Sequence, residues 1–475
     1  MKTNTCLATI LSLGLCSLTM AQEATTVVLS LDSCRALAMA NNKELRIHDA
    51  EQQAAYYERK AAFTKYLPRI SATGSYMHTS KEISLLSTEQ KGELKNIGTT
   101  LGALVPELDG KQETLNHIGS GLVDALHTDT RNMGALGVML TQPIYMGGKI
   151  DAYNQITRYA EQAIHHQHDL AMQEVILDVD KTYWQIVSLE SKKKLAQSYL
   201  RLVEKLDSDV DHMIKEGFAT KADQLSVRVK VNEAKVTLIQ VDNGLAFSRM
   251  LLCQLCGLNL NTLIELKDET AHNAQATTPV HTDVMTAWSH RPELSMLSLS
   301  EKIYTEKVKL ARSEFMPTVA LTGGYLASNP SAFNSFERKM NGMWNVGIVV
   351  KVPIVTFGER SYKIKAAKEE ARAANIKFAE TREKVELQVS QNQQKVDEAA
   401  QRLHTAQRSL EEADENLRLA NEGMKEGVIP LSNVLEAQTA WLKAHSQQVD
   451  AEVDLRLANL YLLKSAGILN TPHRP

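Results

Sequence analysis

The sequence predicts a mainly α protein with a small transmembrane β part, organised as a tandem internal repeat. Three observations lead to this class. The chain repeats itself at a constant offset, each half contains two short stretches in which apolar and polar residues alternate, and each pair precedes a long polar helical pattern. Alternation with period two is typical of strands, and spacings of three and four are typical of coiled-coil helices. We therefore expect long paired helices joined to four strands.

The repeat divides the chain into two similar halves. Four pairs of residues are separated by the same 210 positions: Pro143 and Pro353, Gly148 and Gly358, Gly217 and Gly427, and Gly257 and Gly467. Upstream, as far as Tyr76 and Tyr325 in the first strand of each half, the offset is 249, which leaves 39 extra residues between the two strands of the first half. We expect a first repeat at 22–266, followed by a polar linker at 267–283 that begins the second repeat, 267–475.

The N-terminus has the features of a secretory signal peptide. Lys2 precedes a mostly apolar run at 7–18, and small residues at 19–21 offer a cleavage site. We expect residues 1–21 to be removed on export. Lipidation at Cys16 is the alternative, but Leu15 is too bulky for a good lipoprotein signal.

Each repeat is expected to begin with a helix, at 31–66 in the first half, which Pro68 or Pro317 ends. The expected strands are 69–77, 135–144, 318–326 and 344–354. On one face of the second strand we place Leu136, Val138, Leu140 and Ile144. Such alternation suits a strand with lipid on one side and water on the other. A strand of a soluble sandwich is the alternative, but it does not explain four strands in a helical chain.

Proline and glycine mark the end of each strand pair, in "TQPIYMGGK" at 141–149 and "KVPIVTFGE" at 351–359. Pro143 and Pro353 are expected to end the strand ladder, because proline donates no backbone hydrogen bond. Gly148 and Gly358 let the backbone turn from a tilted strand into a helix. We predict that these four residues are strand-to-helix hinges.

A long helix is expected at about 149–213, spanning roughly 95–100 Å. The helix that returns from it, about 40 residues long, carries a coiled-coil seam. The seam residues are Val231, Ala234, Leu238, Val241 and Leu245. The first and returning helices together match the long one in length, which predicts a wall of paired helices rather than a compact globule.

Four strands are too few to close a membrane barrel, because open edges leave backbone groups unpaired in lipid. Outside the signal no apolar run reaches the roughly 18 residues of a spanning helix, so strands of several chains must share one barrel. Two chains would give eight strands with a filled interior, whereas three give twelve with an aqueous lumen. We therefore expect a homotrimer in which a trimeric α-helical barrel continues a shared 12-stranded β-barrel.

Six stretches carry a resemblance to a known family: "RALAMANNKELR" (35–46), "YLPRISATGSY" (66–76), "LTQPIYMGGKI" (140–150), "KEGFATKADQLSVRVKVNEA" (215–234), "RPELSMLSLSEKIYTEKVKLARSEFMPTVALTGGY" (291–325) and "KEGVIPLSNVLEAQTAWLKA" (425–444). In this order they resemble the TolC-like outer-membrane efflux protein family. The resemblance covers the chain from Leu31 to about Leu469. It implies a homotrimer in the outer membrane that conducts small molecules passively from the periplasm to the exterior. Its implied partners are a periplasmic adaptor and an inner-membrane transporter of the RND or ABC type.

The resemblance also implies where the partner binds. Gly217–Phe218 and Gly427–Val428 occupy the glycine–apolar turns that adaptors contact in the family, at the tip between the long and returning helices. An ordinary helix-ending turn is the alternative. Both turns combine a glycine with an apolar residue, which favours an adaptor-docking tip.

A constriction at the periplasmic entrance is the second implied site. Family members often carry two acidic residues one helical turn apart, and here these positions are Asn433 and Glu436. Glu436 gives a ring of three carboxylates in a trimer, but Asn433 puts the double ring in doubt. Asp223 is the equivalent of Asn433 and is a candidate for polar links that close the tip. Ile429 replaces the basic gate partner of some members.

Other motifs favour structural interpretations. "CQLC" at 253–256 has the spacing of a redox motif, but it lies in an apolar helical run and indicates a packed helix face. Cys34 brings the exported thiols to three, an odd number that indicates no disulfide framework. "HHQH" at 165–168 lacks a supporting cluster of ligands and indicates a solvated face rather than a metal site.

Three aromatic residues and the insertion leave two interpretations open. Tyr76, Tyr325 and Trp344 fit either an aromatic girdle at a membrane interface or the core of the strands. The insertion at about 80–133 lies between the first two strands and faces the exterior. Its amphipathic part either caps the barrel or forms a surface loop.

Composition and motifs restrict the other classes. A formal net charge of −3 argues against a nucleic-acid partner. No nucleophile elbow, phosphate loop or metal signature indicates an enzyme or a cofactor. Two alternatives to an efflux duct remain: a duct for type I protein secretion, and a soluble periplasmic coiled-coil scaffold, which the strand pairs disfavour.

Overall fold

The computed structural model describes residues 27–80, 86–127, 129–269, 278–333 and 338–469. The predicted signal peptide and residues 270–277 of the predicted linker lie outside the described residues. The chain forms two compact units. One comprises the chain up to Ala50, His166–Leu294 and the chain from Thr381, and the other comprises Glu51–His165 and Ser295–Glu380. Each unit takes segments from both sequence repeats.

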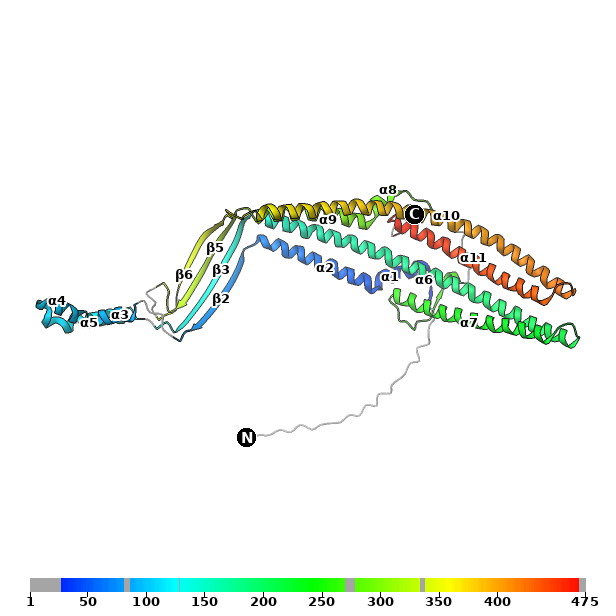
Figure 1. Ribbon diagram of the computed structural model, residues 1–475, viewed down its shortest axis with the longest axis horizontal. Coiled ribbons are helices and arrows are strands. Elements are labelled where there is room, and N and C mark those ends of the chain that lie inside the picture. The colour runs from blue at the N-terminus through cyan, green and yellow to red at the C-terminus, as the bar shows by residue number, and fades with distance from the viewer. Residues whose placement is uncertain (1–26, 81–85, 128, 270–277, 334–337, 470–475) are drawn as a thin grey trace, which may run out of the picture. The chain divides into compact units, whose positions relative to one another are not determined.

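The two repeats contain the same elements in the same order (Figure 1). The first has α1 (Leu31–Asn41), α2 (Lys43–Phe63), β2 (Arg69–His78), β3 (Asn132–Met146), α6 (Lys149–Lys215) and α7 (Lys221–Leu255). The second has α8 (Val284–His290), α9 (Pro292–Ser313), β5 (Thr318–Asn329), β6 (Asn341–Lys351), α10 (Glu359–Lys425) and α11 (Leu431–Ser465). The long helices α6 and α10 have 67 residues each, and the returning helices α7 and α11 have 35 each. The predicted tandem order is confirmed.

The first helix of each repeat is broken, so the prediction of one helix at 31–66 was wrong. Asn42 has an extended backbone and ends α1. Its side-chain oxygen accepts a hydrogen bond from the backbone N–H of Glu44 at 2.8 Å, which starts α2. In the second repeat the break lies at Arg291, before the proline that opens α9. The first repeat adds a short 3₁₀ helix, η1 (Thr64–Tyr66), before Pro68.

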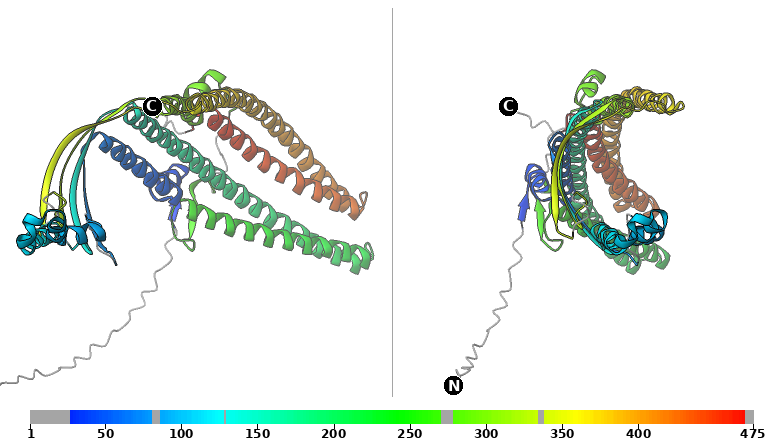
Figure 2. Two further views of the ribbon diagram at one scale, coloured as in Figure 1. Left: turned by 60° about the vertical axis from the view of Figure 1, so that its left-hand side comes forward. Right: turned by 90° about the vertical axis from the view of Figure 1, so that its left-hand side faces the viewer.

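The four strands form one antiparallel sheet in the order β2-β3-β5-β6, and they lie side by side with a common curvature (Figures 1 and 2). Two cross-strand rows show its apolar face: Ile70–Leu140–Gly323–Val346 and Ala72–Val138–Tyr325–Trp344. The opposite face carries the more polar residues, which include Ser71, Thr73, Ser75, Ser328, Asn341 and Asn345. The predicted alternation of the strands is therefore present.

The predicted end of the second strand was wrong. β3 does not stop at Pro143 but pairs with β5 as far as Met146, with a β-bulge between Pro143 and Tyr145. The extra residue reverses the alternation, so Tyr145 lies opposite Val319 on the apolar face. Ile144 is the extra residue of the bulge. The prediction that it lies on the same face as Leu140 was therefore wrong. A proline is tolerated at such a bulge because no ladder donor is required there.

The sheet is not covered by other described parts of the chain. All ten residues of β2 are exposed, and so are nearly all residues of β6. Tyr76, Tyr325 and Trp344 are exposed as well, so they do not form a core within the chain. A sheet with an exposed apolar face and two unpaired edges is costly in water unless another molecule covers the face and pairs with the edges.

The insertion folds into a small helical module. It contains α3 (Thr88–Lys95), α4 (Ile97–Leu104), the 3₁₀ helix η2 (Pro106–Lys111) and α5 (Gln112–Ala125). Close backbone contacts hold it together: a Cβ at Gly119 would lie 1.9 Å from the carbonyl oxygen of Leu94, and one at Gly98 would lie 2.2 Å from that of Gln112. Glycine therefore permits the helices to touch.

The other unit contains two antiparallel helical hairpins, one from α6 and α7 and one from α10 and α11 (Figure 1). A parallel two-stranded sheet joins β1 (Val27–Leu29) to β4 (Ile264–Leu266), which precedes the 3₁₀ helix η3 (Lys267–Glu269). The predicted seam of α7 is present: Val231, Ala234 and Leu245 are buried. No described helix combines the length and the apolar character needed to cross a membrane.

Candidate functional site

The first hairpin ends in a tight turn at Gly217. Its φ of +82° lies in the left-handed region, which glycine adopts without strain. The N–H of Gly217 donates to the carbonyl of Ile214 at 3.1 Å, and the N–H of Phe218 donates to that of Met213 at 2.8 Å. This pattern is the Schellman motif, which satisfies the last carbonyls of α6.

The second hairpin ends in the same way. Gly427 has a φ of +71°, and its N–H donates to the carbonyl of Met424 at 3.1 Å. The N–H of Val428 donates to the carbonyl of Gly423 at 2.9 Å. The next residue after each glycine is apolar and points outward: Phe218 is 77% exposed and Val428 is 76% exposed. Both turns thus present an apolar side chain that no described part of the chain covers.

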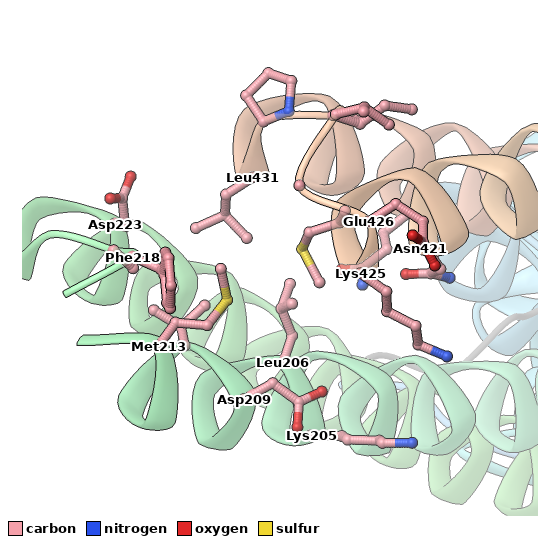
Figure 3. A pocket seen from close by; sticks show the side chains of 18 of the residues that line it. Lys205, Leu206, Asp209, Met213, Phe218, Asp223, Asn421, Lys425, Glu426 and Leu431 are labelled. Atoms are coloured by element: carbon pink, nitrogen blue, oxygen red, sulfur yellow. The ribbon is translucent and has the colours of Figure 1, made fainter. Parts of the chain in front are cut away.

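A groove of about 1250 Å³ lies between the two hairpin tips. Leu206 on α6 and Leu431 on α11 belong to one apolar cluster and point toward each other across it (Figure 3). Phe218, Asp223, Gly427 and Val428 also line the groove. The remaining charged lining residues are Lys205, Asp209, Glu216, Lys425 and Glu426. The groove thus has an apolar interior with charges of both signs, which suits an amphipathic occupant.

Gln438 lines this groove and is 1% exposed. Its side-chain oxygen has no hydrogen-bond partner in the described part of the chain. A buried amide oxygen without a donor destabilises the fold unless an occupant or water supplies one. Sequence analysis missed Gln438, because a single glutamine in a helical seam belongs to no motif that would mark it as part of a site.

Asp223 has a structural role at the start of α7. Thr220 caps the helix by accepting from the N–H of Asp223 at 3.2 Å, while the N–H of Thr220 donates to the Asp223 carboxylate at 2.8 Å. This reciprocal pair is a capping box. The hydrogen bonds from Thr220 lower the pKa of Asp223. The carboxylate is therefore ionised and engaged within its own helix.

The other predicted constriction residues lie elsewhere on the tip. Asn433 and Glu436 are exposed, lie three residues apart on one side of α11, and do not line the groove. No hydrogen bond or ion pair joins Glu436 to the residues that the structure describes. The structure thus brings Asp223 to the groove beside the two glycine turns but leaves Asn433 and Glu436 on another surface.

The predicted hinges all lie in the unit that contains the sheet. Gly148, with a φ of +83°, directly precedes α6, and Gly358, with a φ of +90°, directly precedes α10. Pro143 lies at the bulge inside β3, whereas Pro353 follows the end of β6. Sequence analysis missed that the residue before each glycine is also left-handed: Gly147 has a φ of +64° and Phe357 a φ of +43°.

The structure also places the motifs that were interpreted as structural. Cys253 and Cys256 are buried, which confirms the packed helix face. Nδ1 of His166 lies 3.4 Å from Oδ2 of Asp169, and Nε2 of His168 lies 3.3 Å from Oδ1 of Asp49. In the described residues no group of three or more His, Cys, Asp or Glu side chains is arranged to hold a metal ion.

Known proteins resemble this chain over most of its length. The family model "Outer membrane efflux protein" matches residues 35–258 and 285–468. The outer membrane protein TolC of Vibrio cholerae serotype O1 is 21% identical over 339 residues, which cover 70% of this chain and 76% of that protein. The outer membrane efflux protein BepC of Brucella suis biovar 1 is 20% identical over 400 residues, 83% of this chain and 85% of that one.

A solved structure shows the same fold. The crystal structure of CusC, a protein described as forming a transmembrane channel, superimposes with a TM-score of 0.74 at 15% identity. The match covers 93% of each chain. It therefore includes both the sheet and the helical hairpins.

Proposed function

The chain belongs to the outer membrane efflux protein family, and we propose that it is the exit duct of a tripartite efflux pump. In this proposal three copies form a passive channel in the outer membrane, and small molecules pass through it from the periplasm to the exterior. A periplasmic adaptor links it to an inner-membrane transporter of the RND or ABC type, which supplies the energy. The chain itself is not an enzyme.

The exposed four-stranded sheet carries the proposal. Its two edge strands, β2 and β6, each pair on one side only. Its apolar face is open, with Ile70, Trp344 and Val346 each more than half exposed. Unpaired edges and bare apolar side chains are costly in water, but both are satisfied when sheets join edge to edge in lipid. Three copies joined in this way give a twelve-stranded barrel whose apolar face contacts outer-membrane lipid.

A second surface supports the assembly of several copies. Leu225, Val229, Val236, Ile239 and Phe247 are exposed on α7. They are separated by three, four, seven or eight residues, which places them on one side of the helix. This stripe differs from the buried seam of Val231, Ala234 and Leu245 that packs within the chain. It fits a helix of a neighbouring copy, as a continuous helical barrel requires.

The tip turns are the proposed docking site for the adaptor. Phe218 and Val428 project from matching turns, and the groove between the hairpins accepts an amphipathic helix. Glu436 remains the proposed constriction residue, because its carboxylate is exposed and three copies would form a ring. Asp223 is a weaker candidate for a gate, since Thr220 already engages its carboxylate.

The proposal also assigns the ends of the chain and its repeats. Residues 1–21 act as a signal peptide, so the mature protein is exported. The first repeat spans 22–266, and the linker and second repeat span 267–475. The helices lie in the periplasm and the insertion faces the exterior.

Oligomeric mass and conductance test the proposal. The protein is extracted from outer membranes in detergent, its mass is measured by light scattering, and it is added to planar lipid bilayers. A trimer that conducts cations, and whose conductance rises in Glu436→Ala, supports the duct and its constriction. A monomer or dimer that never conducts overturns the duct. Unchanged conductance in Glu436→Ala removes only the role of Glu436.

A further inference from the structure

The three cysteines of the mature chain form a buried cluster. Cys34 lies on α1, whereas Cys253 and Cys256 lie at the C-terminal end of α7, and each side chain is 0% exposed. The thiol of Cys256 lies 3.5 Å from the carbonyl oxygen of Cys34, although 222 positions separate the two residues. All three thiols are free in this structure. The fold thus brings the thiol of Cys256 against the backbone of Cys34, a residue that is distant in the sequence.

We infer that Cys34 and Cys256 form a disulfide bond that fastens α1 to the end of α7. The family places the protein in the outer membrane, so these helices fold in a compartment where disulfides persist. The inference goes beyond the efflux function, because the bond is a covalent modification that the duct does not require.

Neighbouring contacts hold the two helices together on both sides of Cys256. The side-chain amide of Asn42 donates to the carbonyl of Leu255 at 3.0 Å. Gly257, with a φ of +69°, packs so closely on α1 that a Cβ there would lie 2.5 Å from the Cβ of Asn41. Contacts on both sides of Cys256 therefore hold the end of α7 against α1, and a disulfide between Cys34 and Cys256 would fasten the two helices where they already touch.

Cys253 is the unpaired thiol. Its sulfur lies 3.6 Å from the carbonyl oxygen of Thr262, to which it donates, so this thiol has a hydrogen-bond partner of its own. A bond between Cys253 and Cys256 would join residues that are three positions apart on the same helix, so it would not fasten α7 to α1. Metal binding by the three thiols is not supported, because the described residues contain no group arranged for it.

The second repeat explains why one bond suffices. The positions equivalent to Cys34 and Cys256 are Asp283 and Ala466, so no covalent link is available there. Instead, Arg291 replaces Asn42 and donates to the carbonyl of Ser465, to Gln388 and to Glu293. The first repeat has only the single amide of Asn42 at this point, and a disulfide adds the missing restraint. Closing a loop of this length stabilises the fold mainly by restricting the unfolded chain.

Formation of the bond is a thiol–disulfide exchange. The thiolate of one cysteine attacks a sulfur of a periplasmic dithiol–disulfide oxidoreductase and forms a mixed disulfide. The second thiolate then attacks the cysteine of this chain, the new S–S bond forms, and the oxidoreductase leaves as a dithiol. The two electrons and two protons of the thiols end on that dithiol. Because both cysteines are fully buried in the folded chain, exchange precedes the packing of α1.

Peptide mapping of the wild-type protein tests the inference without any variant. Protein from the outer-membrane fraction is denatured in N-ethylmaleimide, digested without reductant and analysed by mass spectrometry. We expect a linked peptide pair that contains Cys34 and Cys256, and a single alkylated thiol at Cys253. Three alkylated cysteines, or a link that includes Cys253, would overturn the inference. Recovery from the outer-membrane fraction is scored separately, so failure of the proposed location is distinguishable from failure of the bond.

Two further samples sharpen the test. Cys253→Ala is the matched control and keeps the link, whereas Cys256→Ala leaves the remaining two cysteines alkylated. Wild-type protein from cells that lack periplasmic dithiol oxidase activity should show three alkylated thiols. A link that persists in those cells would overturn the enzymatic route, and a link lost in Cys253→Ala would overturn the pairing.

Discussion

Asn42 and Arg291 occupy equivalent positions in the two repeats, and each donates a side-chain hydrogen bond to the end of a returning helix. Asn42 donates to the carbonyl of Leu255 at 3.0 Å, and Arg291 donates to that of Ser465 at 3.0 Å. The donors are separated by 249 positions and the acceptors by 210, the two offsets of the sequence repeat. The last carbonyls of a helix lack partners within it, so both side chains satisfy groups that would otherwise be unpaired.

We expect Arg291→Ala to destabilise the fold more than Asn42→Ala. Each variant leaves a helix-end carbonyl without its donor. Asn42→Ala also loses the hydrogen bond from the N–H of Glu44, whereas Arg291→Ala also loses the hydrogen bonds of a charged guanidinium to Gln388 and Glu293. Leaving a buried polar group unpaired costs about 1–3 kcal/mol, and hydrogen bonds from charged groups lie at the upper end. Thermal unfolding followed by far-ultraviolet circular dichroism measures the difference. Lys43→Ala, an exposed neighbour of Asn42, is the control, and an equal effect of Asn42→Ala and Lys43→Ala would contradict the role of the hydrogen bond.

The glycines at the two ends of α7 should respond differently to alanine. Gly217 and Gly257 both have a positive φ, so each substitution incurs a backbone cost of about 1–2 kcal/mol. A Cβ at Gly217 would meet nothing within 4 Å, whereas one at Gly257 would lie 2.5 Å from Asn41. Overpacking adds about 1–3 kcal/mol. Gly257→Ala should therefore lower the melting temperature clearly more than Gly217→Ala. Equal decreases in melting temperature would show that α1 moves to accommodate the added methyl group.

The sequence predicted the order of elements because each prediction rested on a repeated pattern. Gly217 and Gly427, the strand alternation and the seam of α7 each have a counterpart or a period. The break at Asn42 was missed, because the hydrogen bond from its side chain to the distant carbonyl of Leu255 is not visible in the local sequence. The bulge at Pro143 was missed for a similar reason. A proline near a strand end equally suits the end of the ladder and a bulge, and only the register with β5 distinguishes them.

The candidate site was predictable only in part. Phe218 and Val428 were named through the family resemblance, which the paired glycines supported. Gln438 and Leu431 reach the groove through the packing of two hairpins that are distant in sequence. The cysteine cluster was also not predictable, since spacing within "CQLC" says nothing about Cys34. Local sequence patterns determine elements, whereas contacts between elements determine which polar groups and thiols meet.

The buried ion pair between Arg35 and Asp180 provides a further prediction. Asp180 is 0% exposed. Its carboxylate accepts two hydrogen bonds from Arg35, one from Nε to Oδ1 at 2.7 Å and one from Nη2 to Oδ2. The hydrogen bond to Asp180 raises the pKa of Arg35. Arg35→Ala leaves a buried carboxylate unpaired, which costs about 3–5 kcal/mol.

The matched control replaces both partners. A double variant with Arg35→Met and Asp180→Leu should recover most of the lost stability, because no charge then remains buried. Chemical unfolding of the wild type, the single variant and the double variant measures the three stabilities. A double variant that is no more stable than Arg35→Ala would show that the loss comes from packing rather than from the unpaired charge.

The capping box of α7 should make the start of this helix sensitive to acid. Hydrogen bonds from Thr220 lower the pKa of Asp223 below its unfolded value of about 3.9. A depressed folded pKa stabilises the fold above the unfolded pKa, and this contribution is lost as the pH falls through the folded pKa. Asp223→Ala should therefore lower the melting temperature near neutral pH, by the equivalent of about 1 kcal/mol for a lost cap.

Comparison of the variant with the wild type across pH tests this prediction. The difference in melting temperature should shrink progressively below about pH 4, since protonation then weakens the box in the wild type as well. Asp223→Asn keeps an acceptor without the charge and should show a smaller, less pH-dependent loss. A difference that stays constant down to about pH 3 would mean that the carboxylate charge does not contribute.

The two exposed tip residues should act together in adaptor binding. Phe218→Ser and Val428→Ser each remove an apolar side chain from one of the paired turns, and because both side chains are mostly exposed, little packing inside the chain is lost. Burial of such a side chain in an interface contributes about 1.5–3 kcal/mol, so each variant should weaken adaptor binding by roughly tenfold or more. Binding of purified periplasmic adaptor to the detergent-solubilised protein, measured by surface plasmon resonance, gives the affinities.

A matched substitution separates docking from general loss of surface hydrophobicity. Met285→Ser removes an exposed apolar side chain on α8, away from the tip turns in the sequence, and should leave the affinity unchanged. Phe218 and Val428 lie on different hairpins. If one adaptor helix contacts both, the loss of binding free energy in the double variant should equal the sum of the losses in the two single variants. A double variant no weaker than the stronger single variant would instead mean that adaptors use one turn only, and the groove between the hairpins would then not be the docking site.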